Sequence, residues 1–180
     1  MSTSPKVYVL RWGHRARDFR LTTHVALVSR AFGASGLYLA DVADEGLKKT
    51  VEKVIETWGG EFELIMAVPW KRVVQEWKSR GVIVHLTMYG ENMGNSDVVD
   101  RIRKTGRDIL LIVGSRKVPS AFYTLSDFNV AVGNQPHSEV AAIALFLDRF
   151  FMGRELSMEF ENAKRKISPS AKGKMVWKTP

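Results

Sequence analysis

The sequence contains no cysteine and only four histidines among its 180 residues. Without cysteine the chain can form no disulfide, no cysteine-ligated zinc or iron–sulfur site and no thiol nucleophile. The histidines are scattered and lack the spacing of metal ligands, so we expect no bound metal. This composition fits a reducing compartment, the cytoplasm, best.

Long apolar runs are also missing. No uncharged stretch approaches the roughly 18 to 20 residues that a bilayer span needs. The first residues, MSTSPKVYVLRW, lack the apolar region and the cleavage site of a signal peptide. We therefore expect neither a membrane-embedded nor a secreted protein. With 45% apolar and 26% charged residues, the chain should instead fold as one compact globular unit.

Three common ligand-binding motifs are absent. No glycine-rich sequence ends in Lys-Ser or Lys-Thr, which excludes the phosphate loop of nucleoside triphosphatases. The first expected strand leads into Gly13-His-Arg-Ala-Arg17 instead of a glycine fingerprint, which argues against nicotinamide dinucleotides and against the usual open-sheet methyltransferase. The serine hydrolase elbow is missing as well.

Positive charge is concentrated at the two ends of the chain. The net charge is +8, from 27 Lys and Arg against 19 Asp and Glu. Residues 1–30 carry +5 and residues 153–180 carry +4, so the 122 residues between them sum to −1. Two basic ends on a nearly neutral body fit an anionic partner, nucleic acid first, although basic tails can also serve solubility alone.

Six short apolar runs alternate with helical periodicity, which predicts an α/β fold with a mostly parallel six-stranded sheet and helices on both faces. The expected strands are 7–12, 36–40, 62–68, 82–86, 108–114 and 128–132. The expected helices are 24–32, 44–58, 70–79, 96–104 with Ser96 as N-cap, and 139–151. Helices 24–32 and 139–151 are the most apolar, so we expect them to be buried or shared with a second subunit. The stretch before the sixth strand is rich in turn residues, and the apolar end Met175-Val-Trp177 suits a short hairpin or arm.

Three of the expected strands are followed by unusual loops. Leu86 to Gly90 follows the fourth strand, Gly114 to Val118 the fifth, and Gly133 to Ser138 the sixth. Ligands of open α/β sheets bind beyond the carboxyl ends of the strands, and these loops combine glycines, small polar side chains and a helix start. Each loop alone can be explained as a turn or a helix cap, but together they predict one ligand pocket.

These loops belong to longer stretches with a known pattern. The stretches are Gly13 to Val25 with Arg30 to Ala34, His85 to Gly90, Val113 to Pro119, and Val132 to Ala141 followed by Leu145 to Arg149. In them the chain resembles the archaeal tRNA (cytidine-56)-2'-O-methyltransferases, a branch of the SPOUT superfamily. They occur in the family's order, and the resemblance extends to about residue 172.

The resemblance implies a homodimer that binds S-adenosylmethionine in a deep trefoil knot, formed within an α/β domain of residues 1–152 that precedes a basic extension of residues 153–180. It also implies tRNA as the substrate, methylated on the ribose 2'-hydroxyl of cytidine 56 in the T-loop. The implied cofactor-binding residues are Leu86, Gly114, Ser115, Arg116, Lys117, Val118, Val132, Gly133, Asn134, Gln135, Pro136, His137, Ser138 and Glu139. Among them, the aliphatic side chains suit the walls of an adenine pocket.

Arg15, Arg17, Arg20 and His24 lie in one short segment, which we expect to face the methyl group and the target phosphate. Arg15 and Arg17 are the substrate-binding candidates, because a guanidinium can hold a phosphate bidentately. The resemblance favours Arg20 as the catalytic residue, although an arginine suits oxyanion stabilisation better than proton abstraction. His24 is the more conventional base. The superfamily's usual first motif, with Asn and Arg six residues apart, is absent.

Other interpretations stay open. The chain could be a non-catalytic RNA-binding or cofactor-sensing module, or a related knotted enzyme that acts on a base or on another nucleotide of tRNA or rRNA. The early arginines could also bind only the RNA backbone. Outside the loops, we expect His85 in the core, and Trp12 either in the core or stacked on a base.

Overall fold

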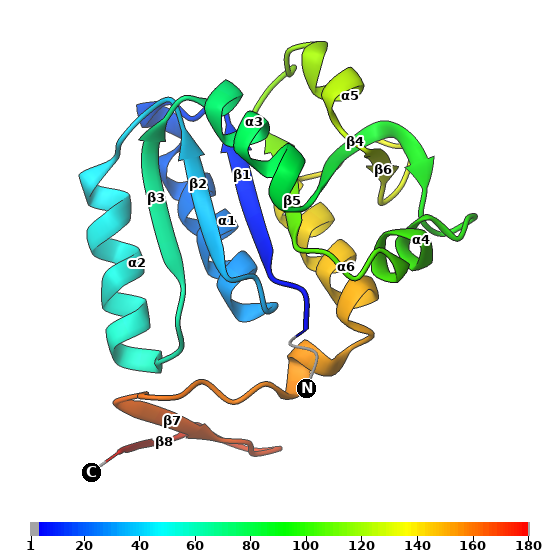
Figure 1. Cartoon of the computed structure of the whole chain (residues 1–180). Helices are drawn as coiled ribbons and strands as arrows, with labels where there is room; N and C mark the ends of the chain where they lie inside the picture. Colours follow the sequence, from blue (N-terminus) through cyan, green and yellow to red (C-terminus); the bar gives the residue numbers. More distant parts are fainter. Residues whose placement is uncertain (1–3, 180) are drawn as a thin grey trace.

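A six-stranded parallel sheet in the order β3-β2-β1-β5-β4-β6 forms the centre of the molecule (Figure 1). The computed structural model describes residues 4–179; residues 1–3 and 180, which belong to the two predicted basic ends, lie outside the described residues. The strands are β1 (Val7–Trp12), β2 (Gly36–Ala40), β3 (Glu63–Val68), β4 (Val82–Asn92), β5 (Ile109–Gly114) and β6 (Phe128–Ala131). The helices are α1 (Phe19–Ala31), α2 (Glu45–Trp58), α3 (Trp70–Arg80), α4 (Val98–Lys104), α5 (Ala121–Leu125) and α6 (Glu139–Phe151), with the 3-10 turns η1 (Ala16–Asp18) and η2 (Arg154–Ser157).

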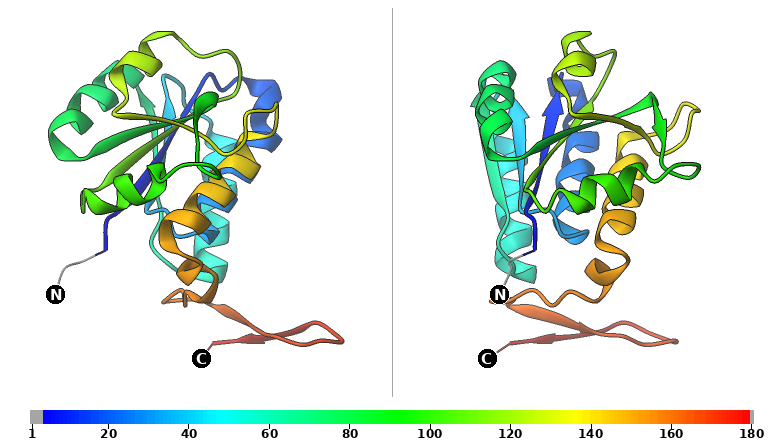
Figure 2. Two further views of the ribbon diagram at one scale, coloured as in Figure 1. Left: turned by 90° about the vertical axis from the view of Figure 1, so that its right-hand side faces the viewer. Right: turned by 45° about the vertical axis from the view of Figure 1, so that its right-hand side comes forward.

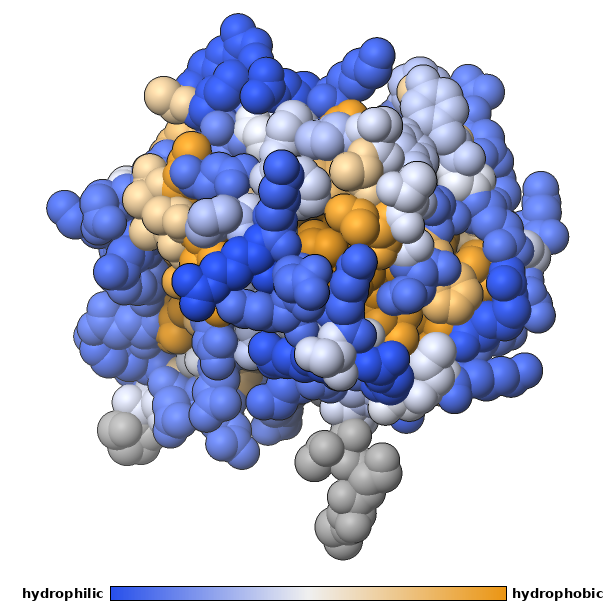
Figure 3. All heavy atoms as spheres, turned by 45° about the horizontal axis from the view of Figure 1, so that its top comes forward, coloured by the Kyte–Doolittle hydropathy of each residue, from blue (hydrophilic) through white to orange (hydrophobic). Residues whose placement is uncertain are grey.

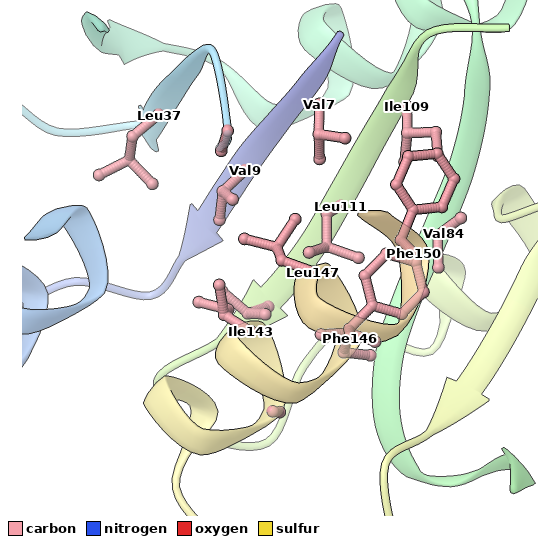
Figure 4. Close-up of a cluster of buried hydrophobic side chains, with 14 of the residues drawn as sticks. Val7, Val9, Leu37, Val84, Ile109, Leu111, Ile143, Phe146, Leu147 and Phe150 are labelled. Carbon is pink, nitrogen blue, oxygen red and sulfur yellow. The ribbon is translucent and has the colours of Figure 1, made fainter. Parts of the chain in front are cut away.

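Successive side chains of each strand point to opposite faces of the sheet, so they pack against different sets of helices. Val7 and Val9 of β1 belong to a cluster with α1, α2, α4 and α6, whereas Tyr8 and Leu10 belong to a cluster with α3 and α5. Figure 4 shows the first cluster, in which side chains of β1 and β5 pack against the apolar face of α6. Both faces of the central strands are therefore buried, as their nearly continuous apolar sequences predicted. In this layer α1 and α6 lie side by side (Figure 2).

The prediction of six parallel strands with helices on both faces is confirmed, and most predicted bounds lie within one residue of the observed ones. The start of α1 is a correction, because the helix begins at Phe19 and not at His24. Thr22 extends the buried stripe of α1 by one turn, and its polar side chain hides that turn from a search for apolar periodicity. Arg20 therefore lies on the helix and not in a segment before it.

Two shorter elements also correct the predictions. The turn-rich stretch before β6 contains α5, a helix of five residues whose Phe122 is completely buried. Helix α4 begins at Val98 with Asp97 as its N-cap, two residues later than predicted. The hydroxyl of Ser96 still accepts a long hydrogen bond of 3.4 Å from the Val98 N–H, so Ser96 contributes to the turn without being the cap.

Strand β4 was predicted to end at Leu86, but it resumes after a four-residue excursion. Leu86 and Glu91 both pair with Val130 of β6, so residues 87–90 leave the ladder, and we call them the β4 excursion. Gly90 permits a close approach to β6, because a Cβ there would lie 2.6 Å from backbone atoms of that strand. The excursion thus lies within the predicted loop, and the strand that resumes at Glu91 keeps it attached to the sheet.

A two-stranded antiparallel hairpin, β7 (Arg165–Ser168) with β8 (Met175–Lys178), confirms the predicted hairpin or arm. It lies beneath the amino-terminal ends of the sheet strands, at the opposite end of the molecule from the three predicted loops (Figure 1). The Gly60 N–H donates to the Glu161 carbonyl at 2.7 Å, and Lys164 pairs with Glu56 of α2. Among residues 4–179, no helix is both long and apolar enough to cross a bilayer.

Candidate functional site

One cavity of about 690 Å³ lies where β4, β5 and β6 end, a size typical of small-molecule sites. Figure 3, in which this end of the molecule is tilted toward the viewer, shows hydrophobic side chains near the middle of the visible face, with hydrophilic ones around them. The lining residues are His85, Leu86, Thr87, Met88, Tyr89, Val113, Gly114, Ser115, Arg116, Lys117, Val118, Ser120, Tyr123, Val132, Pro136, His137, Glu139 and Ala142. The prediction that three loops form one pocket is confirmed in its geometry.

Four residues of the predicted cofactor set do not line this cavity: Gly133, Asn134, Gln135 and Ser138. Two of them support its walls instead. The Asn134 side-chain amide donates to the Met88 and Gly90 carbonyls at 2.8 and 3.2 Å, which fixes the β4 excursion. The Ser138 hydroxyl accepts from the Val140 N–H at 3.2 Å and caps α6.

The loop after β5 is a tight turn held against the end of β1. A Cβ at Gly114 would lie 2.3 Å from Val118 Cγ1, so the turn closes only with glycine at this position. The Ser115 hydroxyl donates to the Gly13 carbonyl at 2.6 Å, and the Ser115 N–H donates to the Trp12 carbonyl at 3.0 Å. The segment that follows β1 is therefore joined to the cavity wall through its backbone.

Trp12 was predicted either to stack on a base or to lie in the core, and it is partly buried. Its ring meets Phe122 edge to face at 6.1 Å between centroids. The Arg116 guanidinium lies 5.1 Å from the Trp12 ring centre, a cation–π contact. The Trp12 ring thus has an aromatic and a cationic partner within the chain.

His85 is buried, as predicted, with 1% of its surface exposed, yet it also lines the cavity. Its Nδ1 lies 3.0 Å from Asn129 Oδ1, and its ring meets the Tyr123 ring edge to face. Burial lowers the pKa of His85, because the charged imidazolium is poorly solvated there, and the Asn129 contact opposes this in part. Sequence reasoning missed Tyr123 because α5 was predicted as a turn.

None of Arg15, Arg17, Arg20 and His24 lines the cavity. Arg15 pairs with Asp18 at 3.1 Å, and the other three are exposed. Arg20 and His24 are four residues apart, so they lie on one outward face of α1. The expectation that this segment faces the pocket is thus not met within a single chain.

A buried polar network explains why this part of α1 has that orientation. Arg11, the last inward-pointing residue of β1, donates from Nε to the Thr22 hydroxyl at 2.9 Å. The same hydroxyl lies 2.7 Å from His14 Nδ1, and His14 Nε2 lies 3.1 Å from the Asp44 carboxylate. Because a carboxylate only accepts, His14 donates from Nε2 to Asp44. With Thr22 pinned inward, the residues two positions away on either side point outward.

Comparison with known proteins identifies the family. A family described as "tRNA ribose 2'-O-methyltransferase, aTrm56" matches residues 58–177. The chain is 55% identical to the tRNA (cytidine(56)-2'-O)-methyltransferase of Staphylothermus marinus over 175 residues, covering 96% of this chain and 93% of the relative. It is 53% identical to the enzyme of the same description from Thermococcus kodakarensis, covering 94% and 96%. The chain belongs to the aTrm56 family.

The fold of this aTrm56 member also resembles solved structures. The crystal structure of the SpoU methyltransferase AviRb from Streptomyces viridochromogenes, described in complex with AdoMet, superposes with a TM-score of 0.58 at 17% identity. The match covers 84% of this chain and 58% of that one. The predicted resemblance to the archaeal tRNA (cytidine-56)-2'-O-methyltransferases is confirmed by the family match and the relatives, whereas this likeness at low identity shows the α/β fold alone. The trefoil knot, which the strand pattern alone does not predict, stays a prediction.

Proposed function

We propose that this chain transfers a methyl group from S-adenosylmethionine to the ribose 2'-hydroxyl of cytidine 56 in tRNA. Its membership of the aTrm56 family carries the reaction and the substrate. The convergence of the loops after β4, β5 and β6 on one cavity carries the location of the cofactor site.

The residues of the cavity fit this methyl donor. Leu86, Val118 and Val132 give it apolar walls for the adenine ring, and the tight turn at Gly114 lets backbone groups approach the nucleoside. Glu139 adds a carboxylate for the positive sulfonium of the ligand. When bound, the donor supplies an activated methyl group, so the protein must align the hydroxyl, accept its proton and stabilise the developing oxyanion.

The groups that would do this on α1 point away from the cavity of their own chain, and we propose that a second copy brings them to it. Arg20 and His24 share their part of α1 with Phe19 and Leu21, large apolar side chains that are 37% and 38% exposed. On the neighbouring α6, Leu145 is 49% exposed. A homodimer packed through α1 and α6 would cover these side chains and place Arg20 of each protomer at the cavity of its partner.

The basic ends supply the contact with the tRNA backbone in this proposal. Residues 1–152 would form the catalytic unit, and residues 153–180 an extension that binds RNA. The hairpin of this extension carries exposed lysine and arginine side chains. A hollow of about 560 Å³ between α2 and the start of the hairpin is lined by residues that include Lys53, Trp58, Lys164 and Arg165. Lysine, arginine and an aromatic ring suit phosphates and unstacked bases. We place the protein in the cytoplasm, the compartment that also holds its proposed tRNA substrate.

Mapping of ribose methylation on tRNA transcripts tests the activity. We expect protein and S-adenosylmethionine together to methylate cytidine 56, and a matched transcript with 2'-deoxycytidine at that position to stay unmodified. Methylation at another nucleotide would overturn the substrate, and absence of methylation with a folded protein would overturn the reaction.

Arg20→Ala tests the role of the early arginines. If Arg20 stabilises the oxyanion, the single-turnover rate should fall by about 100-fold while tRNA affinity changes little. Arg17→Ala is the matched control and should weaken tRNA binding with a smaller effect on the rate at saturation. His24→Gln separates the base from the oxyanion-stabilising group, because only loss of the base should remove the acidic limb of the rate-against-pH profile. An unchanged single-turnover rate in Arg20→Ala would refute its catalytic role.

A further inference from the structure

Arg11 is a fully buried cation at the end of the central strand β1, with 0% of its surface exposed. It follows Val7 and Val9 on the strand face that packs against α1 and α6, where an aliphatic residue would continue the core. Within the described residues, Nη1 and Nη2 of Arg11 complete no hydrogen bond, although Nη2 lies 3.2 Å from Glu139 Oε1. Burial accordingly lowers the pKa of Arg11, with the nearby Glu139 carboxylate acting against that shift.

Burying such a cation costs folding free energy, because a buried ion pair often stabilises a protein no more than well-packed hydrophobic residues of similar volume do. The chain offers an instructive comparison in Arg30 of α1, which is also buried. Arg30 donates to the Gly59 carbonyl and packs over the Phe160 ring, and neither of these two partners lines the cavity. Arg11, in contrast, contacts a residue that lines the cavity.

Glu139 is distinctive among the described residues that line the cavity, because it is the only carboxylate there. The basic side chains in that lining are Arg116, Lys117, His85 and His137. The methyl donor carries a positive sulfonium, whereas the product after methyl loss is a neutral thioether. A single carboxylate held in the wall therefore favours the charged donor over its own product.

We propose that Arg11 is a positioning residue that holds the Glu139 carboxylate in the cavity wall, where that carboxylate selects the cationic methyl donor over the neutral product. This inference rests on the proposed function, since it concerns the ligand of the same cavity. The second bond of the guanidinium, to Thr22, ties α1 to the same point. One buried side chain thus fixes both the donor-selecting carboxylate and the helix that carries Arg20.

Calorimetric titration of the full-length protein with S-adenosylmethionine and with S-adenosylhomocysteine tests the proposal, with the ratio of the two affinities as the readout. Glu139→Gln should lower that ratio about tenfold by removing one charged contact. Arg11→Met should lower it in the same direction, and Arg11→Lys should restore part of it. The double variant Arg11→Met with Glu139→Gln should show no loss beyond that of Glu139→Gln alone.

Arg30→Met is the matched control, because it removes a buried arginine whose hydrogen-bond and cation–π partners, Gly59 and Phe160, do not line the cavity. It should lower the melting temperature and leave the affinity ratio unchanged, which separates selection from general stability. An unchanged or increased ratio in Arg11→Met, or additive effects in the double variant, would overturn the positioning role. If the unaltered protein binds neither compound, the proposed cofactor fails instead. Should Arg11→Met not fold, Glu139→Gln and Arg11→Lys still decide the outcome.

Discussion

Two glycines of the cavity loops differ in what a methyl group would meet. A Cβ at Gly114 would collide with Val118, whereas a Cβ at Gly133 would find no atom within 4 Å. We expect Gly114→Ala to open the turn after β5 and to weaken S-adenosylmethionine binding by about tenfold or more, because the strain of overpacking amounts to about 1 to 3 kcal/mol. Gly133→Ala should bind the donor as the unaltered protein does. Calorimetry on both variants checks this, and equal losses would contradict it.

His85 makes the stability of the fold depend on pH. Its pKa is lowered in the folded state by burial, whereas in the unfolded chain it binds a proton near pH 6.5. Below that pH the unfolded state holds more protons, so the free energy of unfolding falls as the pH is lowered. We expect His85→Gln to reduce the loss between pH 7.5 and 5.5 by about 1 kcal/mol in urea unfolding.

The unaltered chain, unfolded in urea at the same two pH values, provides the reference for that measurement. A loss of equal size in His85→Gln and in the unaltered chain would show that other groups cause the acid sensitivity.

At the scale of elements, the C-terminal hairpin is separate from the main sheet and strongly basic. Residues 162–180 contain six Lys and Arg and no Asp or Glu, and Trp177 of β8 is 47% exposed beside Lys166. A hairpin of two strands has no core of its own, so its exposed face is available to a partner. The positive charge of the hairpin favours binding to the negatively charged backbone of RNA.

Substituting Lys166, Lys174 and Lys178 together by Glu should weaken tRNA binding and flatten its salt dependence. For single-stranded RNA the log–log slope is roughly −0.7 per neutralised phosphate. The single-turnover rate at saturating tRNA should stay unchanged, because the hairpin lies at the opposite end of the molecule from the three loops that line the cavity. The matched control replaces Lys71, Lys78 and Lys104, exposed lysines of the nearly neutral body. Equal weakening in both variants would indicate a general charge effect.

Elements with a long apolar pattern were predictable from the sequence, and the turns without one were not. Strand β2 and helix α6 have the predicted bounds, because their buried positions are occupied by aliphatic and aromatic side chains, and β1 keeps its predicted bounds although Arg11 is buried near its end. The first turn of α1 escaped prediction since Thr22 is its buried residue, and α5 escaped because five residues are too few to show a period.

At the scale of the whole molecule, assembly should decide activity. Leu21→Glu and Leu145→Glu each place a charge on the apolar surface of α1 and α6. We expect either variant to be monomeric by light scattering and to lose methyl transfer, while S-adenosylmethionine still binds. Ile167→Glu, at a hairpin residue that is 63% exposed, is the control and should keep the oligomeric state. A monomeric unaltered protein with full activity would contradict the proposed homodimer.

At the site, the sequence predicts the position of the pocket but not the direction in which the side chains of α1 point. The three loops were predictable as one pocket, because parallel strands deliver their carboxyl ends to one edge of the sheet. The direction of Arg20 was not, since it depends on the buried contact between Arg11 and Thr22, two residues eleven positions apart. No local pattern reveals which way a helix is rotated about its axis when a polar bond fixes it.

Asn134 fastens two rims of the cavity to each other. Its amide holds the β4 excursion through the Met88 and Gly90 carbonyls, while its own backbone belongs to the connection between β6 and α6. Neither rim can move outward without breaking the hydrogen bonds of Asn134, so a displacement of one rim has to carry the other with it.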